Sequence, residues 1–200
     1  MRLFVAIFPA PPAVSDLAAA VDRMHLGKAA AAGRNVRLDR PELWHITLAF
    51  LGEVAEDRGA EVESVLSSVI PAWTREHPTR PAQRLAGGGR FNRGPSTVLW
   101  VGLQGDTAPV RDLAGRVNTE LTKAGLMAED RRPYRPHLTL ARCGDRLSAG
   151  EIDADLAALR AYAGPQWTVS EMVLVSSVLG PPRRYDRLHT WDLSTTTLPR

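Results

Sequence analysis

Cysteine and lysine are almost absent from this chain. A single cysteine, Cys143, occurs among the 200 residues, which excludes an intrachain disulfide and a zinc site built on cysteines. Lysine occurs only at Lys28 and Lys123, so arginine supplies nearly all of the positive charge behind a net charge of +3. Arginine forks onto phosphates and stacks on bases, so the composition permits a nucleic-acid partner. A GC-rich genome gives the same bias, and charge alone therefore does not predict one.

Long apolar runs are also missing. No stretch reaches the roughly 18 apolar residues that a membrane span requires, and Met1–Pro12 lacks the basic start, sustained apolar segment and cleavage site of a signal peptide. With one cysteine, this predicts a cytoplasmic protein with no membrane partner. Hydrophobic residues make up 44% and charged residues 24%, as in soluble globular proteins. We expect residues 1–200 to form a single domain made of two intertwined lobes, and we expect a monomer.

Several familiar catalytic patterns do not occur. The run Gly87-Gly88-Gly89 resembles a phosphate-binding loop, but no helix and no Lys-Ser/Thr follow it directly. A bulge or turn within a loop-rich stretch, residues 77–95, is the better interpretation. The chain shows no HExxH motif and no Ser-His-Asp or Cys-His grouping that we could defend.

One four-residue pattern is present twice: His45-Ile46-Thr47-Leu48 and His137-Leu138-Thr139-Leu140. Residues i and i+2 of a β-strand share a face. Each copy therefore presents an imidazole beside a hydroxyl on one face and two apolar side chains on the other. Two such strands brought together would form a pocket with two acid/base groups and two hydroxyl donors.

The remaining periodicity predicts an α+β fold. Apolar runs and alternation predict strands at residues 2–8, 44–51, 97–103, 136–142, 167–179 and 188–193. Helical spacing predicts helices at 13–32, 57–73, 107–124 and 148–162, with Pro71 kinking or ending the second and Gly125 following the third. The irregular mixture favours mainly antiparallel sheets flanked by helices. The two halves echo one another, which indicates a bilobal pseudo-two-fold duplication with the lobes facing across a central cleft.

Paired histidines beside hydroxyls suit the opening of a cyclic phosphodiester without a metal. In-line attack by water needs one group to take a proton and another to protonate the leaving oxygen. Histidine suits both roles because its ordinary pKa, about 6.5, lies near working pH. Thr47 and Thr139 could donate hydrogen bonds to the phosphate oxygens. Arg142, five residues after His137, could neutralise charge, although a solvated charge at a strand end is the alternative interpretation.

Other side chains near the motifs have two interpretations each. The aromatic residues Trp44, Phe91 and Tyr134 could stack on a base or simply pack. Arg131, Arg132 and Arg135 could guide an RNA backbone or line a solvated loop. The other three histidines, which lack the motif surroundings, are interpreted as structural or surface residues: His25, His77 and His189.

The chain resembles the two-histidine phosphoesterase superfamily, and within it the RNA 2',3'-cyclic phosphodiesterases, also called 2'-5' RNA ligases. The resemblance runs through MRLFVAI, LWHITLAFLGEV, VLWVGL, RRPYRPHLTLAR and VLVSSVLGPPRRY. It implies a bilobal fold with a central cleft, His45 as proton donor to the departing 3' oxygen and His137 as the proton acceptor that activates water. It also implies phosphate binding by Thr47, Thr139 and Arg142, a 2'-phosphate product, and 2'-5' ligation as the reverse reaction. Phe8 and the prolines after it depart from the polar continuation expected there.

Three alternatives remain open at this stage. The enzyme could act on another small cyclic phosphate, such as a nucleotide or sugar derivative. The chain could be a non-catalytic module that binds RNA ends. Two histidines on separate strands could also ligate zinc, although no carboxylate pair completes such a site. We expect no cofactor and no metal.

Overall fold

The computed structural model describes residues 1–34, 36–93, 96–129, 132–143, 147–178, 180 and 183–194. Its strands are β1 (Arg2–Ile7), β2 (Arg37–Leu38), β3 (Ile46–Glu53), β4 (Ala82–Arg93), β5 (Ser96–Gly105), β6 (His137–Cys143), β7 (Ala163–Thr168), β8 (Glu171–Val178) and β9 (Arg184–Asp192). Its helices are α1 (Pro11–Arg23), α2 (His25–Ala31), α3 (Gly59–Glu76), α4 (Thr107–Lys123) and α5 (Ala149–Ala161), with short 3-10 turns η1 (Pro41–Leu43) and η2 (Glu56–Arg58). The predicted α+β class is confirmed.

The strands form one antiparallel sheet in the order β7-β4-β5-β6-β3-β1-β8-β9, with β2 added beside β6. Its two halves, β7-β4-β5-β6 and β3-β1-β8-β9, meet where β6 pairs with β3. The residues paired at this seam are Ile46 and Leu138, which hold the same position in the two motifs. The duplication predicted from the sequence therefore appears as two four-stranded halves of one continuous sheet.

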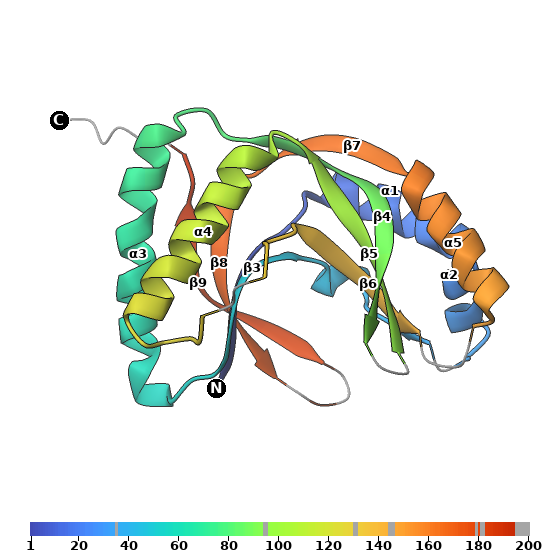
Figure 1. The fold of residues 1–200 in the computed structure, drawn as a ribbon, viewed down its shortest axis with the longest axis horizontal. Coiled ribbons are helices and arrows are strands. Elements are labelled where there is room, and N and C mark those ends of the chain that lie inside the picture. Colours follow the sequence, from blue (N-terminus) through green and yellow to red (C-terminus); the bar gives the residue numbers. More distant parts are fainter. Residues whose placement is uncertain are drawn as a thin grey trace.

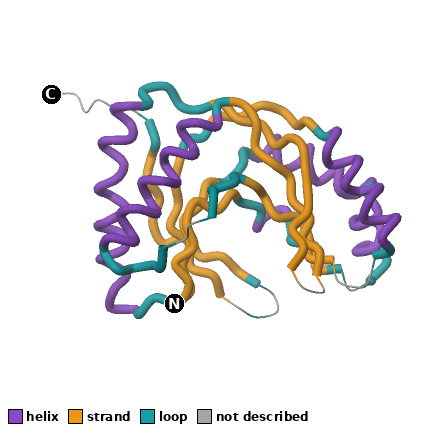
Figure 2. The backbone as a smooth tube through the Cα atoms, in the orientation of Figure 1, coloured by secondary structure: helices purple, strands orange, loops and turns teal. Residues whose placement is uncertain are grey.

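The helices lie on two outer flanks, with the strands between them (Figure 1, Figure 2). Helices α3 and α4 cover the half that contains β3, and α1, α2 and α5 cover the half that contains β4. The chain crosses between halves, since α1 follows β1 yet packs on β7 and β4, while α4 follows β5 yet packs on β3. The single-domain organisation stays a prediction.

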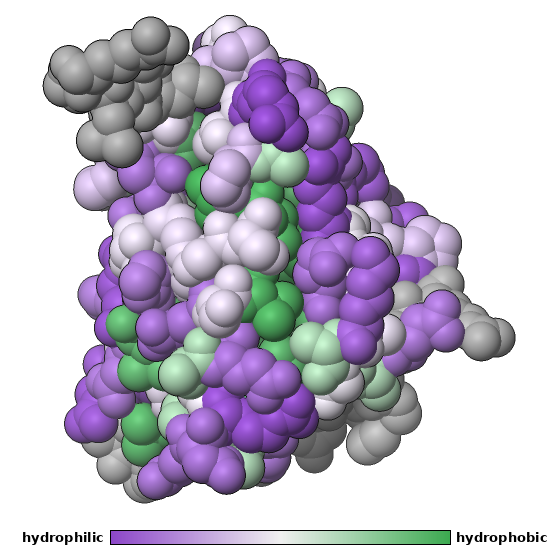
Figure 3. Space-filling model, turned by 90° about the vertical axis from the view of Figure 1, so that its left-hand side faces the viewer, coloured by the Kyte–Doolittle hydropathy of each residue, from purple (hydrophilic) through white to green (hydrophobic). Residues whose placement is uncertain are grey.

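The main core lies between the sheet and these helices. Leu3, Val5 and Ile7 of β1 are buried in it, whereas Phe4 and Ala6 point to the other face of the sheet and pack with Val173, Val175 and Tyr185. The outer flank beside α3 is largely hydrophilic, with apolar residues confined to a narrow band (Figure 3). We call the face that carries Phe4 the inner face of the sheet.

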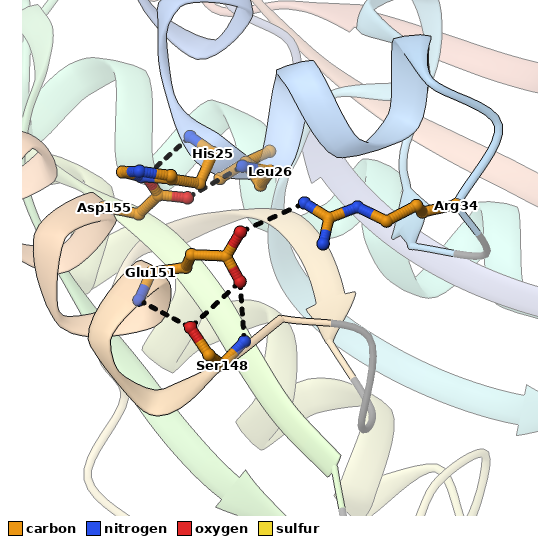
Figure 4. A network of polar contacts seen from close by, with 6 residues as sticks. All are labelled: His25, Leu26, Arg34, Ser148, Glu151 and Asp155. Carbon is orange, nitrogen blue, oxygen red and sulfur yellow. Dashed lines mark hydrogen bonds and ion pairs between the residues drawn. The ribbon is translucent and has the colours of Figure 1, made fainter.

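The helix predicted at residues 13–32 is broken into α1 and α2 at Met24, whose backbone is extended. Asp155 of α5 causes the break, because its buried carboxylate accepts the backbone N–H groups of His25 and Leu26 at 2.8 and 2.9 Å (Figure 4). Gly27 allows the close turn, since a Cβ there would lie 2.3 Å from the Val21 carbonyl oxygen. Nearby, Ser148 and Glu151 form a capping box at the start of α5, and Arg34 pairs with Glu151.

Three further expectations are corrected. Helix α3 does not end at Pro71 but continues to Glu76, because the buried Trp73 anchors the last turn through Nε1–H to Pro109 O at 3.0 Å. The stretch at 77–95 is mostly strand β4, although the predicted bulge is present at Gly87, whose φ is +62°. The strand predicted at 167–179 is two strands in opposite halves of the sheet, since the chain changes halves at Val169 and Ser170. Leu179 lies outside the described residues.

No helix in the described ranges is long and apolar enough to cross a membrane.

Candidate active site

The two motifs lie side by side on the inner face at the seam. Ile46 and Leu138 are fully buried on the helix side of the sheet, and the residues that flank them, including Thr47 and Thr139, are half-buried. Because the strands are antiparallel, the pairing of Ile46 with Leu138 directs His45 towards Thr139 and His137 towards Thr47. The structure therefore brings together the four motif residues that the sequence singled out.

Both motif strands carry a β-bulge at the same place. Thr139 and Ala141 pair with the adjacent residues Trp100 and Leu99, which leaves Leu140 as the extra residue in β6. Thr47 and Ala49 pair likewise with Ala6 and Val5, which leaves Leu48 extra in β3. A bulge inserts one residue and reverses the alternation beyond it.

The bulge in β6 decides where Arg142 lies. Strict alternation over five residues would put Arg142 on the opposite face from His137. After the bulge, Ala141 is buried and Arg142 is exposed on the side of His137 and Thr139. The matching position in β3 is Phe50, which is 49% exposed and lies under the Arg2 guanidinium, 5.0 Å from the ring centre.

The histidines share one hydrogen-bond arrangement. Nδ1 of His45 lies 2.7 Å from Leu43 O, and Nδ1 of His137 lies 2.7 Å from Arg135 O. A carbonyl oxygen can only accept, so Nδ1 is the protonated nitrogen in each ring. The proton that titrates is therefore the one on Nε2, and each imidazole can take or give it there.

The rings have different surroundings. His45 is enclosed by aromatic rings of the inner face, with centroids 4.7 Å from Phe4, 5.3 Å from Tyr185 and 6.0 Å from Phe8. His137 has Phe91 edge-on at 5.0 Å and Trp100 at 6.0 Å. Phe91 itself stacks on Trp100, over which Arg135 lies at 5.7 Å.

The pKa of His45 is lowered from its ordinary value. Burial among these rings is the main cause, because it disfavours the cation, and the charges of His137 and Arg183 act in the same direction. The hydrogen bond to Leu43 opposes the shift. The charge of a protonated His137 therefore acts on His45 from the other half of the sheet.

Two of the aromatic candidates near the motifs have packing roles. Trp44 is buried and donates from Nε1 to Asp39 O at 2.9 Å. The Tyr134 hydroxyl donates to Thr47 O at 3.0 Å, and burial raises its pKa, so it stays protonated. Phe91 is half-buried beside His137. Of the flanking arginines, Arg131 lies outside the described residues.

The other histidines each face an acid away from the motifs. His25 contacts Asp155 at 3.0 Å, His77 contacts Asp112 at 3.0 Å, and His189 contacts Glu63 at 3.5 Å. Their interpretation as structural or surface residues stays a prediction, which these contacts support. Within the described ranges, no cluster of three or more His, Cys, Asp or Glu side chains is arranged to hold a metal ion.

The residues that surround His45 from other strands were not among the site residues predicted from the sequence. Phe4 shares its face of β1 with Ala6, and Tyr185 arrives from β9. Arg183, just before β9, reaches Asp39, with Nη1 at 3.3 Å from Oδ1. The alternation of Phe4, Ala6 and Phe8 was a signal for an inner-face set in β1. Arg183 lies in the segment VLVSSVLGPPRRY, which carries part of the family resemblance, but nothing in the sequence placed its side chain near His45.

Comparisons with known proteins agree with the motifs. The model of the 2'-5' RNA ligase superfamily matches residues 13–181. RNA 2',3'-cyclic phosphodiesterase of Escherichia coli (strain K12) is 31% identical over 166 residues, 82% of this chain and 81% of that protein. The protein of the same name from Aeropyrum pernix is 36% identical over 102 residues, 50% of this chain and 53% of that protein.

Solved structures agree as well. E. coli LigT in its apo form is 25% identical with a TM-score of 0.65, over 97% of this chain and 98% of that one. A Thermus thermophilus protein, TT0787, is 25% identical with a TM-score of 0.64, over 96% and 98%. The relatives carry the enzyme class that the paired motifs predict, a cyclic phosphodiesterase. The chain belongs to the 2'-5' RNA ligase superfamily.

Proposed function

We propose that this protein hydrolyses RNA 2',3'-cyclic phosphate ends to 2'-phosphates by metal-independent acid/base catalysis. His45 is the proton donor to the departing 3' oxygen, and His137 is the proton acceptor that activates water. The supporting observation is the pairing of two equivalent imidazoles across the seam, each with Nδ1–H fixed on a backbone carbonyl. With Nδ1 engaged in this way, Nε2 is the ring nitrogen of each histidine that we assign to proton transfer.

The two histidines together account for both proton transfers of the hydrolysis. Nε2 of His137 takes a proton from water as the water oxygen bonds to phosphorus. The bond from phosphorus to the 3' oxygen breaks, and His45 gives its Nε2 proton to that oxygen. Before the next turnover, His137 loses its added proton to solvent and His45 takes up a proton from solvent.

The threonines and Arg142 support the phosphate. Thr47 and Thr139 share the inner face with the histidines, where their hydroxyls can donate to the non-bridging oxygens. Arg142, placed on that face by the bulge in β6, supplies a positive charge to oxygens that become more negative in the transition state.

The lowered pKa of His45 suits a proton donor. A more acidic imidazolium gives up its proton more readily to an alkoxide-like leaving group. The bound phosphate anion opposes the burial penalty and the positive neighbours, so we expect substrate binding to raise the pKa of His45 and to favour its protonated form.

The test is turnover of a nucleoside 2',3'-cyclic phosphate in excess EDTA, with the product identified by phosphorus NMR. We expect the 2'-phosphate to form at an undiminished rate. His45→Ala and His137→Ala should each lower kcat by several orders of magnitude, and the control His189→Ala, on the outer flank, should not. Activity that disappears with chelator, or a 3'-phosphate product, contradicts the proposal.

The same assay separates the alternatives. Preference for a cyclic-ended oligonucleotide over mononucleotides supports RNA as the substrate, and the opposite preference supports a small cyclic phosphate. Tight binding without product supports a binding module. Incubation of a cyclic-ended RNA with an RNA bearing a 5' hydroxyl tests 2'-5' ligation.

We further propose that the protein acts as a monomer in the cytoplasm. Light scattering of the purified chain at assay concentrations tests the first part, and a dimeric mass would contradict it.

A further inference from the structure

Three charged side chains from separate segments meet at the inner face: Asp39, Arg142 and Arg183. Asp39 directly follows β2, and its backbone N–H donates to Leu140 O at 2.8 Å, which fixes it to the second motif strand. Arg183 Nη1 lies 3.3 Å from Asp39 Oδ1. Burial raises the pKa of the Asp39 carboxyl, and the charges of Arg183 and Arg142, which lie close enough to act on it, both lower that pKa. Asp39 thus lies between two arginines that come from opposite halves.

Arg183 is also near enough to His45 for its charge to lower the pKa of that imidazole. It stands two residues before Tyr185, whose ring meets His45 edge-on at 5.3 Å. Arg40 Nη2 donates to Arg183 O at 3.0 Å, so the backbone at this point is held in place. The side chain of Arg183 is 41% exposed and can reach a ligand.

The two motif strands differ in the residue that each presents after its bulge, and this difference explains why Arg183 matters. Beside His137, the bulge presents Arg142. Beside His45, the equivalent bulge presents Phe50, which carries no charge. A phosphate held between the two motifs would therefore have an arginine from one motif strand only. Arg183 supplies the missing charge from the β8–β9 hairpin.

We propose that Arg183 is a second phosphate-binding arginine, which contacts the non-bridging oxygens from the His45 side while Arg142 contacts them from the His137 side. Asp39 serves as the internal counter-ion that holds both arginines before substrate arrives. This inference rests on the proposed function. Two arginines and one carboxylate give a net charge of +1, and one protonated imidazole raises it to +2. That charge matches the roughly two negative charges of a ring-opened phosphate monoester at neutral pH.

The test compares Arg183→Gln with a neighbour. Arg184 is exposed and bonded to Asp186 at 2.8 and 3.0 Å, so Arg184→Gln is the matched control. We expect Arg183→Gln to lower kcat/KM for a nucleoside 2',3'-cyclic phosphate and to weaken binding of a nucleoside 2'-monophosphate, each by about 10- to 100-fold. Arg183→Lys should recover part of both losses, and all three variants should keep the wild-type Tm.

A pH profile adds a readout that a structural role would not move. The charged or titratable groups known to act on His45 are His137 of β6 and Arg183, and Tyr185 of β9 contacts its ring. Loss of the Arg183 charge should shift the profile of kcat/KM to higher pH, because one positive neighbour of the imidazole is removed.

The outcomes separate this inference from the proposed function. Wild-type turnover with Arg183→Gln equal to Arg184→Gln in both assays overturns the inference alone, as does a change confined to Tm. A wild-type protein with no turnover overturns the proposed function. In that case, weaker 2'-monophosphate binding by Arg183→Gln still supports the phosphate contact.

Discussion

His45 and His137 hold the same position in their motifs but differ in their surroundings. His45 and His137 fix their Nδ1 protons in the same way, on the carbonyl two residues earlier. His45, however, is enclosed by Phe4, Phe8 and Tyr185 and has a lowered pKa, whereas the rings described beside His137 are Phe91 of β4 and Trp100 of β5. The difference between the two imidazoles therefore arises from residues outside the motifs.

At the same scale, the Tyr134 hydroxyl is a positioning group. It links the segment before His137 to the backbone of Thr47 at 3.0 Å, next to the single pairing that joins β3 to β6. We expect Tyr134→Phe to cost about 1 kcal/mol of stability and to lower kcat several-fold with KM little changed, because the ring stays and only the link is lost. Differential scanning calorimetry and steady-state kinetics measure the two effects.

The control for this substitution is Tyr162→Phe. The Tyr162 hydroxyl donates to Asp16 at 2.7 Å, on the flank of α1 and away from both motifs. It should lose similar stability and keep wild-type kcat. Equal kcat values for the two variants would contradict a positioning role for Tyr134.

At the scale of elements, the glycine run in β4 shapes the surroundings of His137. A Cβ at Gly89 would lie 2.3 Å from the Trp100 ring, which packs beside Phe91 and His137. We expect Gly89→Ala to push the indole outwards, to lower Tm, and to reduce kcat through the loosened His137. Gly115 of α4 is the control, because nothing lies within 4 Å of a Cβ there. Gly115→Ala should raise stability by roughly 1 kcal/mol and leave kcat unchanged; a stable, fully active Gly89→Ala would contradict this account.

Comparison of the predicted and observed elements shows which of them the sequence pattern predicts. The strands and helices that carry strong periodicity, including both motif strands, were predicted within a few residues. The break at Met24 was not, because it depends on Asp155, 131 positions further along the chain. The sequence also did not predict that the chain changes halves at Val169 and Ser170, because two short apolar strands in succession have the same pattern as one long strand. The bulge that turns Arg142 inwards leaves no local mark, because Leu140 and Ala141 are an ordinary apolar pair.

On the scale of the whole molecule, the site lies where the two halves of the sheet meet. The described contacts across this seam near the motifs include the pairing of Ile46 with Leu138, the Tyr134 link to Thr47, and the ion pair of Arg183 with Asp39. Each brings a residue of one half against a residue of the other. The relative placement of the histidines therefore depends on how the halves are joined, since each half carries one motif.

The coupling across this seam can be measured directly. A protonated His137 lowers the pKa of His45, so His137→Ala should raise the pKa of His45 towards its ordinary value, and Arg183→Gln should do the same. Histidine NMR titrations of the wild-type protein and the two variants measure this shift, with His189 of the outer flank as the internal reference. His45 stays buried in both variants, so neither substitution should restore its ordinary pKa in full. The double variant, with His137→Ala and Arg183→Gln, should raise the pKa of His45 further than either single variant. A His45 titration that is identical in all of these proteins would mean that the halves do not communicate by charge, and the paired proton transfer would then have to rest on geometry alone.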